Sequence, residues 1–211
     1  MAEYYWWARN YNTQTDNRGN LNPGYQKDVK PEQGMSYELG AEQKVSDKYN
    51  TKLTLYYQNI DDYINFEHTY PFFIYNVDKV NVWGAEWENV YNLDNSNRLI
   101  FNYTNQHTKQ EGTDQSEFDY SPRHKIALAY QYDAKPWQVR YTVNYTGNQK
   151  ASYGKVTLSS YTIHNLAVVR ELDPERTLSL YVDNLFDKDY VEQYGYPMQG
   201  RSYYVSLTQK L

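Results

Sequence analysis

The chain has 211 residues, a formal net charge of -5 at pH 7 and no cysteine. The absence of cysteine excludes disulfides, thiolate metal sites and cysteine nucleophiles. The balance is mildly acidic and the lysines and arginines are scattered without a basic stripe, which argues against nucleic acid as a partner. No segment approaches the roughly 18 consecutive apolar residues of a membrane-spanning helix, so a helical membrane protein is excluded as well.

Aromatic residues are unusually abundant, with 26 tyrosines and 5 tryptophans. The mean hydropathy of -0.95 would by itself suggest a very polar soluble protein. Hydropathy scales score tyrosine as polar, whereas its amphipathic ring sits well at the headgroup level of a membrane, where transmembrane barrels carry aromatic girdles. The low mean hydropathy is therefore misleading, and the composition fits a transmembrane β-barrel better than a soluble fold.

Stretches of about ten residues in which apolar and polar residues alternate recur along the chain, as in half-buried strands. In 137–146, for example, Val143 belongs to the apolar set and Thr142 to the polar set. The strand over 3–11 and the strand over 161–170 alternate less cleanly. In chain order the expected strands include 3–11, 53–58, 99–103, 126–132, 137–146, 161–170, 178–182 and 203–211. The strands of a soluble β-sandwich alternate in the same way, so alternation alone does not distinguish a sandwich from a transmembrane barrel, and the lengths of the connections are needed.

The connections are alternately short and long. The short ones are rich in turn formers and recur about every 40 residues, at 46–49, 94–97, 133–136 and 172–175. The long ones are polar and aromatic, at 12–34, 61–79, 107–121, 149–159 and 187–200. Unequal loops at the two ends are typical of outer-membrane barrels. We therefore predict an all-β, antiparallel, up-and-down transmembrane β-barrel of about ten strands, forming a single domain over 1–211, with both termini on the short-turn side.

Several segments carry a resemblance to a known family. The most specific is 183–190, Asp-Asn-Leu-Phe-Asp-Lys-Asp-Tyr, which is followed by Gly-Tyr-Pro at 195–197 and Gly-Arg-Ser-Tyr-Tyr-Val at 200–205. Upstream, the segments 30–34, 37–40 and 81–88 fit the same pattern. Together they resemble the barrel of the TonB-dependent receptors, which are outer-membrane transporters for siderophores, haem and cobalamin.

The resemblance implies a location in the outer membrane of a Gram-negative-type bacterium, in contact with lipid and lipopolysaccharide. Members of the family have an N-terminal plug domain before a barrel of 22 strands, so this chain looks like the C-terminal barrel portion. The segment beginning at Met1 has none of the features of a signal peptide. The expected function is uptake of a siderophore-type metal chelate or of cobalamin, incomplete in this chain alone, with TonB acting through the missing N-terminal barrel and plug segment.

A second function remains open. A half-barrel in a membrane would leave two edges of unpaired backbone groups, each costing several kcal/mol in hydrocarbon. The chain must therefore close on itself, pair with a missing segment, or stay out of the bilayer. If it closes, the strand over 3–11 would pair with the strand over 203–211, and the product would be a small outer-membrane barrel acting as a narrow pore, an adhesin or a structural protein.

Two groups of residues are candidates for specific roles. A structural role is expected for the C-terminal motif, because Asn184 and Asp187 can hydrogen-bond the backbone where a strand breaks and Gly200 permits tight entry into the last strand. The residues of that motif are Asn184, Phe186, Asp187, Tyr190, Gly200 and Arg201. Ligand contact is expected of the aromatic loop residues Tyr70, Phe72, Phe73 and Tyr75, since exposed rings supply stacking area at low entropy cost. The alternative is that these rings anchor the strand ends in the lipopolysaccharide layer.

Signals for catalysis and metal binding are weak. The sequence contains no nucleophile elbow, His-Glu-x-x-His, dinucleotide-binding or phosphate-loop pattern. The acidic groups at 61–62 and 114–119 lack the fixed spacing of a calcium loop. None of the histidines is spaced as a metal ligand, and the expectation is that they are solvated in loops or in the barrel lumen: His68, His107, His124 and His164. We expect no enzyme activity, no cofactor and no metal site.

Overall fold

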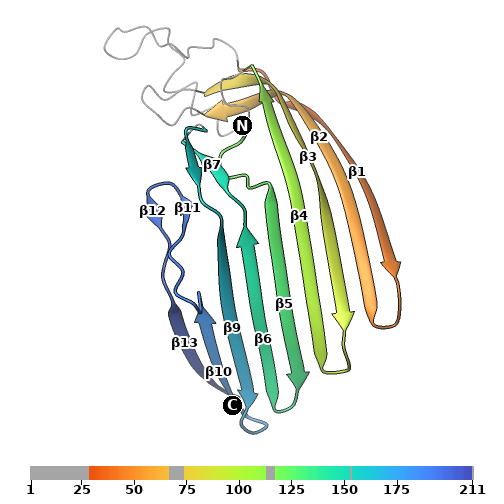
Figure 1. The fold of residues 1–211 in the computed structure, drawn as a ribbon, viewed down its shortest axis with the longest axis vertical. Coiled ribbons are helices and arrows are strands. Elements are labelled where there is room, and N and C mark those ends of the chain that lie inside the picture. The colour runs from red at the N-terminus through yellow and green to blue at the C-terminus, as the bar shows by residue number, and fades with distance from the viewer. Residues whose placement is uncertain (1–28, 67–73, 113–116, 153, 211) are drawn as a thin grey trace. The chain divides into compact units, whose positions relative to one another are not determined.

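The computed structural model describes residues 29–66, 74–112, 117–152 and 154–210 (Figure 1). Within these ranges the chain forms strands and no helix. Nine strands make one sheet in the order β1-β2-β3-β4-β5-β6-β9-β10-β13. Their bounds are Gln33–Lys44 (β1), Tyr49–Phe66 (β2), Ile74–Asn92 (β3), Asn97–Glu111 (β4), His124–Ala134 (β5), Trp137–Thr146 (β6), Tyr161–Glu171 (β9), Arg176–Asp183 (β10) and Ser202–Gln209 (β13).

The predicted fold class is confirmed. Consecutive long strands are neighbours throughout the sheet, and the ladders from β4 to β13 are antiparallel. In the described part of the chain β1 and β13 form the two edges and do not pair with each other, so the sheet is open there. The predicted strand over 3–11 lies outside the described residues.

The single domain expected over 1–211 stays a prediction. The chain divides into two compact units, and each is described by itself below. The first comprises 1–37, 57–82 and 108–116, and the second comprises 38–56, 83–107 and 117–211. All four short turns belong to the second unit.

The predicted long loops are only partly correct. The loop expected over 61–79 is wrong for most of its length, because β2 continues to Phe66 and β3 begins at Ile74. Two other segments contain short hairpins. These are β7 (Gln149–Ala151) with β8 (Val156–Leu158), and β11 (Val191–Gln193) with β12 (Tyr196–Pro197). Polar sequence suggested loops in these places, but polar residues can also pair in a ladder of backbone hydrogen bonds.

Three of the short turns share one hydrogen-bonding scheme. A side-chain oxygen of Ser46, Asp94 or Asp173 accepts the backbone N–H groups two and three residues later, at 2.8 to 3.3 Å. The N–H of Ser96 and the side chain of Asn97 lower the pKa of the Asp94 carboxyl. The Arg176 side chain, followed by backbone N–H groups, lowers the pKa of the Asp173 carboxyl. The turn chemistry that the sequence indicated is therefore present in the structure.

The short turns lie side by side at one end of the second unit. Each turn is joined to the next by a backbone hydrogen bond of 2.7 to 2.9 Å, and the last bond reaches the C-terminal residues. The pairs, donor first, are Asn92 to Lys48, Asp133 to Ser96, Glu171 to Pro136 and Lys210 to Glu175. The C-terminal strand therefore ends on the short-turn side, as predicted.

The register gives the sheet an apolar face and a polar face. Leu128 pairs with both Phe101 and Val143, and directly paired residues of antiparallel strands point to the same side. Ala129 pairs with Thr142 in the same manner on the other side. Extending the ladders defines the apolar face by Leu99, Phe101, Tyr103, Ile126, Leu128, Tyr130, Val139, Tyr141, Val143, Leu166, Val168, Leu178, Leu180, Val182, Tyr203, Val205 and Leu207.

Many side chains of the apolar face are open to solvent in the chain alone. Val205 is 71% exposed and Leu207 is 63% exposed. A contiguous apolar surface of this kind marks contact with a partner or with a membrane. His164 pairs with Val143 and so lies on this same face. The expectation of a solvated or lumenal histidine is therefore wrong for His164. The sequence around His164 could not show this, because the face on which it lies is set by pairing with Val143 of another strand.

Candidate ligand-binding end of the sheet

The end of the second unit opposite the short turns carries both hairpins (Figure 1). Glu192 of β11 connects them to the main sheet. Its backbone C=O accepts a hydrogen bond from Gln149 Nε2 of β7 at 3.0 Å, and its carboxylate accepts one from the Tyr161 hydroxyl at 3.1 Å. The ring of Tyr161 also packs against that of Tyr190, with centroids 4.6 Å apart. The two hairpins are thus fixed to β9 by polar and aromatic contacts.

The connection between β4 and β5 is fastened to the same hairpins. The Tyr120 N–H donates to the Lys150 carbonyl at 2.8 Å, and the Gly154 N–H donates to Asp119 Oδ1 at 3.0 Å. We call the described residues 117–123, the β7–β8 hairpin and the β11–β12 hairpin together the loop platform. Because its parts hold one another, the platform is a surface of defined shape at the long-loop end.

Exposed aromatic side chains lie on the loop platform. Tyr194 is 53% exposed and Tyr196 is 65% exposed, on either side of Gly195, whose φ of +85° suits the hairpin turn. Burial, aided by the carboxylates of Glu192 and Asp183, raises the pKa of the Tyr190 hydroxyl nearby. Our sequence reasoning did not propose Tyr194 or Tyr196 as ligand contacts. The Tyr-Gly-Tyr pattern could have indicated them, because a glycine between two tyrosines favours a tight turn that exposes both rings.

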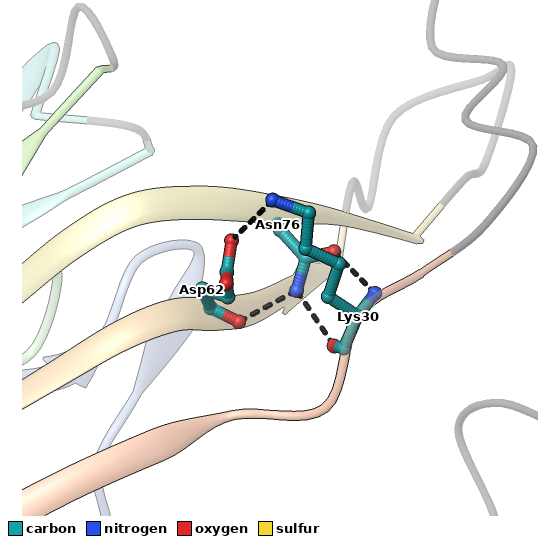
Figure 2. A network of polar contacts seen from close by, with 3 residues as sticks. All are labelled: Lys30, Asp62 and Asn76. Carbon is teal, nitrogen blue, oxygen red and sulfur yellow. Dashed lines mark hydrogen bonds and ion pairs between the residues drawn. The ribbon is translucent and has the colours of Figure 1, made fainter.

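The aromatic loop expected to contact a ligand falls largely outside the described residues. Tyr70, Phe72 and Phe73 lie outside the described residues. Tyr75 lies in β3, where the structure describes its backbone only. The base of this loop is described in the first unit (Figure 2).

That base is a small polar network. Asn76 Oδ1 accepts the Lys30 N–H at 2.8 Å, while Asn76 Nδ2 donates to the carbonyls of Lys30 at 3.0 Å and of Asp62 at 2.6 Å (Figure 2). Lys30 Nζ lies 3.3 Å from Asp62 Oδ1. Asp62 has a φ of +54°, a conformation that Asp tolerates better than most residues. The network joins the segment before β1 to the facing parts of β2 and β3 at the foot of the predicted ligand loop.

The C-terminal motif contains the backbone hydrogen bonds that the sequence suggested. The N–H of Asn184 donates to Asn165 Oδ1 at 3.0 Å, and the side-chain amide of Asn184 binds the backbone of Lys188. Asp187 Oδ1 accepts the Arg201 N–H at 2.7 Å. Asn184 and Asp187 have φ values of +49° and +55°. These bonds support a structural role for the motif.

Other members of the motif pack around the same break. A Cβ at Gly200 would lie 2.8 Å from Asp187 Oδ1, so glycine leaves room for that carboxylate. The Arg201 side chain donates to the Leu185 carbonyl at 3.3 Å. Phe186 is 65% exposed and meets the His164 ring edge to face, with centroids 4.7 Å apart. The motif thus fixes the route of the chain from β10 towards β13.

Across the described residues, no helix is long and apolar enough to cross a membrane. No group of three or more His, Asp or Glu side chains in that part of the chain is arranged to hold a metal ion.

An up-and-down antiparallel sheet with one apolar face, tight turns at one end and a loop platform at the other is the wall of an outer-membrane type of β-barrel. The family model described as "TonB dependent receptor-like, beta-barrel" matches residues 2–185. The chain therefore belongs to the TonB-dependent receptor family, and the resemblance inferred from the sequence is confirmed.

Individual relatives agree with this assignment. The vitamin B12 transporter BtuB of Vibrio cholerae is 31% identical over 81 residues, which are 38% of this chain and 12% of that protein. The ferric-catecholate import receptor Fiu of E. coli K12 superposes with a TM-score of 0.72 at 24% identity, over 93% of this chain and 30% of the receptor. The copper transporter OprC superposes with a TM-score of 0.73 at 18% identity, over 86% of this chain and 32% of the transporter. The two structural likenesses show the fold alone, and the chain spans about a third or less of each relative.

Proposed function

We propose that this chain is the C-terminal barrel portion of an outer-membrane receptor that takes up a siderophore-type metal chelate or cobalamin. The observation that carries the proposal is the open sheet of the described residues, with a continuous apolar face and with two edge strands that are unpaired within that part of the chain, in a member of this family. Hydrocarbon does not tolerate unpaired strand edges, so β1 and β13 need further strands beside them. The preceding barrel segment of a receptor would supply those strands.

The apolar face is proposed to contact outer-membrane lipid, with lipopolysaccharide around its long-loop end. The polar face then lines the lumen, where the N-terminal plug of the whole receptor would lie and through which TonB would act. The functions of the relatives, which are transport of vitamin B12, import of ferric catecholate and transport of copper, support a metal chelate or cobalamin as the cargo class.

The ligand contacts are proposed to be aromatic. Tyr70, Phe72, Phe73 and Tyr75 remain the candidates from the sequence, and the exposed rings of Tyr194 and Tyr196 on the loop platform extend the set. Rings at the mouth of a barrel offer stacking area with hydroxyl groups for orientation. Catalysis is not proposed, because the family consists of receptors and transporters.

The proposal is tested by an uptake assay in a receptor-deleted strain. The chain with an added signal peptide is expected to give no uptake, whereas a chimera that joins it to the plug and preceding strands of a full-length relative is expected to restore uptake. The same chimera in a strain lacking TonB serves as the control and should be inactive. Energy-dependent uptake by the chain alone would contradict the proposal that it is incomplete.

No observation favours the self-closed small barrel. In the described part of the chain β13 pairs with β10 and has no strand on its other side.

A further inference from the structure

Arg170 is a cation on the apolar face, at the short-turn end of that face. It pairs directly with Trp137 of β6 and with Leu178 of β10, so the three side chains point to the same side of the sheet. All three are exposed. β9 ends at the next residue, Glu171, whose N–H donates to the Pro136 carbonyl in the adjoining turn. A permanent positive charge therefore stands at the border of the surface that is proposed to face lipid.

The guanidinium of Arg170 is oriented by an aromatic ring. Its central carbon, Cζ, lies over the Trp137 ring, 4.9 Å from the ring centroid. A guanidinium in this position is attracted to the negative face of the indole. Contact with the ring takes up one face of the guanidinium, whereas its five N–H donors point outward in its plane. The ring thus holds the group in place and leaves its donors open to an acceptor.

Neighbouring charges at this end of the sheet are neutralised within the protein. Lys135 Nζ lies 3.0 Å from Glu171 Oε2, and Arg176 Nε donates to Asp173 Oδ2 at 2.7 Å. Glu171 points to the opposite side of β9 from Arg170, because successive side chains of a strand alternate. Among the described residues Arg170 has no ion pair, and its guanidinium has no hydrogen bond. A guanidinium is always charged and only donates, so its acceptor has to come from outside this part of the chain.

The lengths of β6 and β9 place this charge at the level of lipid headgroups. A tilted strand needs about 9 to 11 residues to cross the hydrocarbon core of a membrane. β6 has 10 residues and β9 has 11, so each is just long enough to span that core. Trp137 is the first residue of β6, and Arg170 is the last but one of β9. Both therefore lie at the membrane border, where transmembrane barrels carry their aromatic girdles.

We propose that Arg170 and Trp137 form a binding site for the phosphate group of a phospholipid in the periplasmic leaflet of the outer membrane. The short turns of outer-membrane barrels face the periplasm, which selects that leaflet. The guanidinium offers two parallel N–H donors to two oxygens of one phosphate, and such charge-assisted bonds are about twice as strong as neutral ones. The Trp137 ring and Leu178 then lie beside the acyl chains. This inference rests on the proposed placement of the apolar face in the outer membrane.

The test uses the full chain with 15N-labelled arginine. The chain is bound to vesicles of digalactosyl diacylglycerol, which has no phosphate, or to vesicles that also contain phosphatidylglycerol. Solid-state NMR then measures the loss of 15N guanidinium signal that nearby 31P causes, and the Arg170 signal is identified as the one missing in Arg170→Gln. We expect this loss with phosphatidylglycerol and none with the galactolipid alone. Inorganic phosphate added to the galactolipid vesicles should leave the signal unchanged, because the ligand is proposed to be a lipid.

Matched variants separate the site from the effect of charge alone. Arg170→Gln removes the guanidinium and is expected to lower the preference for spin-labelled phosphatidylglycerol over spin-labelled galactolipid about tenfold. Arg140→Gln removes the same charge from the polar face of β6 and should leave that preference unchanged. Arg170→Lys keeps the charge without the planar fork, and Trp137→Leu keeps the guanidinium without the ring. Each of these two should lower the preference by a smaller factor than Arg170→Gln does.

The two proposals fail in different ways. The phosphate site is overturned if the parent chain floats with both kinds of vesicle but Arg170 shows no 31P effect. It is also overturned if Arg170→Gln, Arg170→Lys or Trp137→Leu keeps the full preference for phosphatidylglycerol, if Arg140→Gln lowers it equally, or if inorganic phosphate has the same effect as the lipid. Each of these results leaves the proposed function standing. Failure of the parent chain to float with any vesicle contradicts the lipid-facing apolar face, and with it both proposals.

Discussion

Asn184 binds the backbone of Lys188 through both ends of its side-chain amide. Oδ1 accepts the Lys188 N–H at 2.8 Å, and Nδ2 donates to the Lys188 carbonyl at 2.9 Å. In the first unit Asn76 binds the backbone of Lys30 in the same way, at 2.8 and 3.0 Å. In each case a side-chain amide replaces the backbone of a neighbouring strand at a place where regular pairing stops.

Two substitutions of Asn184 should separate the contribution of its hydrogen bonds to stability from the contribution of its backbone conformation. Asn184 is 4% exposed, so Asn184→Ala leaves the groups of Lys188 without their partner and also places alanine at a φ of +49°. We expect the free energy of unfolding to fall by about 2 to 4 kcal/mol in Asn184→Ala. Asn184→Gly loses the same bonds but tolerates the φ, and should retain about 1 kcal/mol more. Urea titrations in detergent measure the free energy of unfolding of both variants. An equal loss in the Ala and Gly variants would show that the positive φ of this residue carries no strain.

Gly84 is expected to be irreplaceable for a steric reason. A Cβ there would lie 2.2 Å from the Asn105 carbonyl oxygen and 2.6 Å from the Tyr56 hydroxyl. Gly84→Ala should therefore push β3 away from β4 and lower the free energy of unfolding by about 1 to 3 kcal/mol or more. The matched control is Gly40→Ala, whose new Cβ would meet nothing nearer than Thr54 Oγ1 at 3.7 Å. Adding Tyr56→Ala to Gly84→Ala should not restore stability, because the backbone oxygen stays in place.

The short turns should make stability depend on acidic pH. The pKa values of Asp94 and Asp173 are lowered from the ordinary value of 3.8 by hydrogen bonds in the folded chain. The unfolded chain then takes up protons first as the pH falls, so the contribution of these turns is complete above pH 3.8 and is lost as the pH falls below it.

This pH dependence is checked with the double variant Asp94→Asn and Asp173→Asn. Asparagine keeps an oxygen acceptor but does not titrate, so unfolding midpoints of the variant, measured between neutral pH and about pH 3, should change less than those of the parent chain. If the unfolding midpoints of the parent chain and of the variant change equally with pH, the two turn carboxylates do not contribute to the pH dependence of stability.

The sheet could be predicted because its signals are local. The alternation in 137–146 fixes which side chains share a face, and the side chains of Asp94 and Asp173 determine their own turns. The loop platform could not be predicted in this way. It depends on contacts between distant residues, such as Gln149 with Glu192, and no local pattern encodes such a pair.

The same limit applies to the candidate site. The exposure of Tyr194 and Tyr196 follows from the hairpin on which they lie, and that hairpin was expected to be loop. The position of His164 on the apolar face follows from its pairing with Val143 across β6 and β9. Its own strand alternates poorly, so the sequence of that strand alone did not assign the face.

The assignment of the two faces can be tested at adjacent positions of β6. Val143 lies between Leu128 and His164 on the apolar face, and its neighbour Thr142 lies between Ala129 and Asn165 on the polar face. Val143→Arg should prevent stable insertion into lipid, because a charge on the lipid side near the bilayer midplane costs about 2 to 4 kcal/mol. Thr142→Arg should be tolerated, since its side chain would face the wet side of the sheet. Heat-modifiable mobility of the chain refolded in lipid distinguishes the two variants, and equal folding of both would show that the faces have been assigned wrongly.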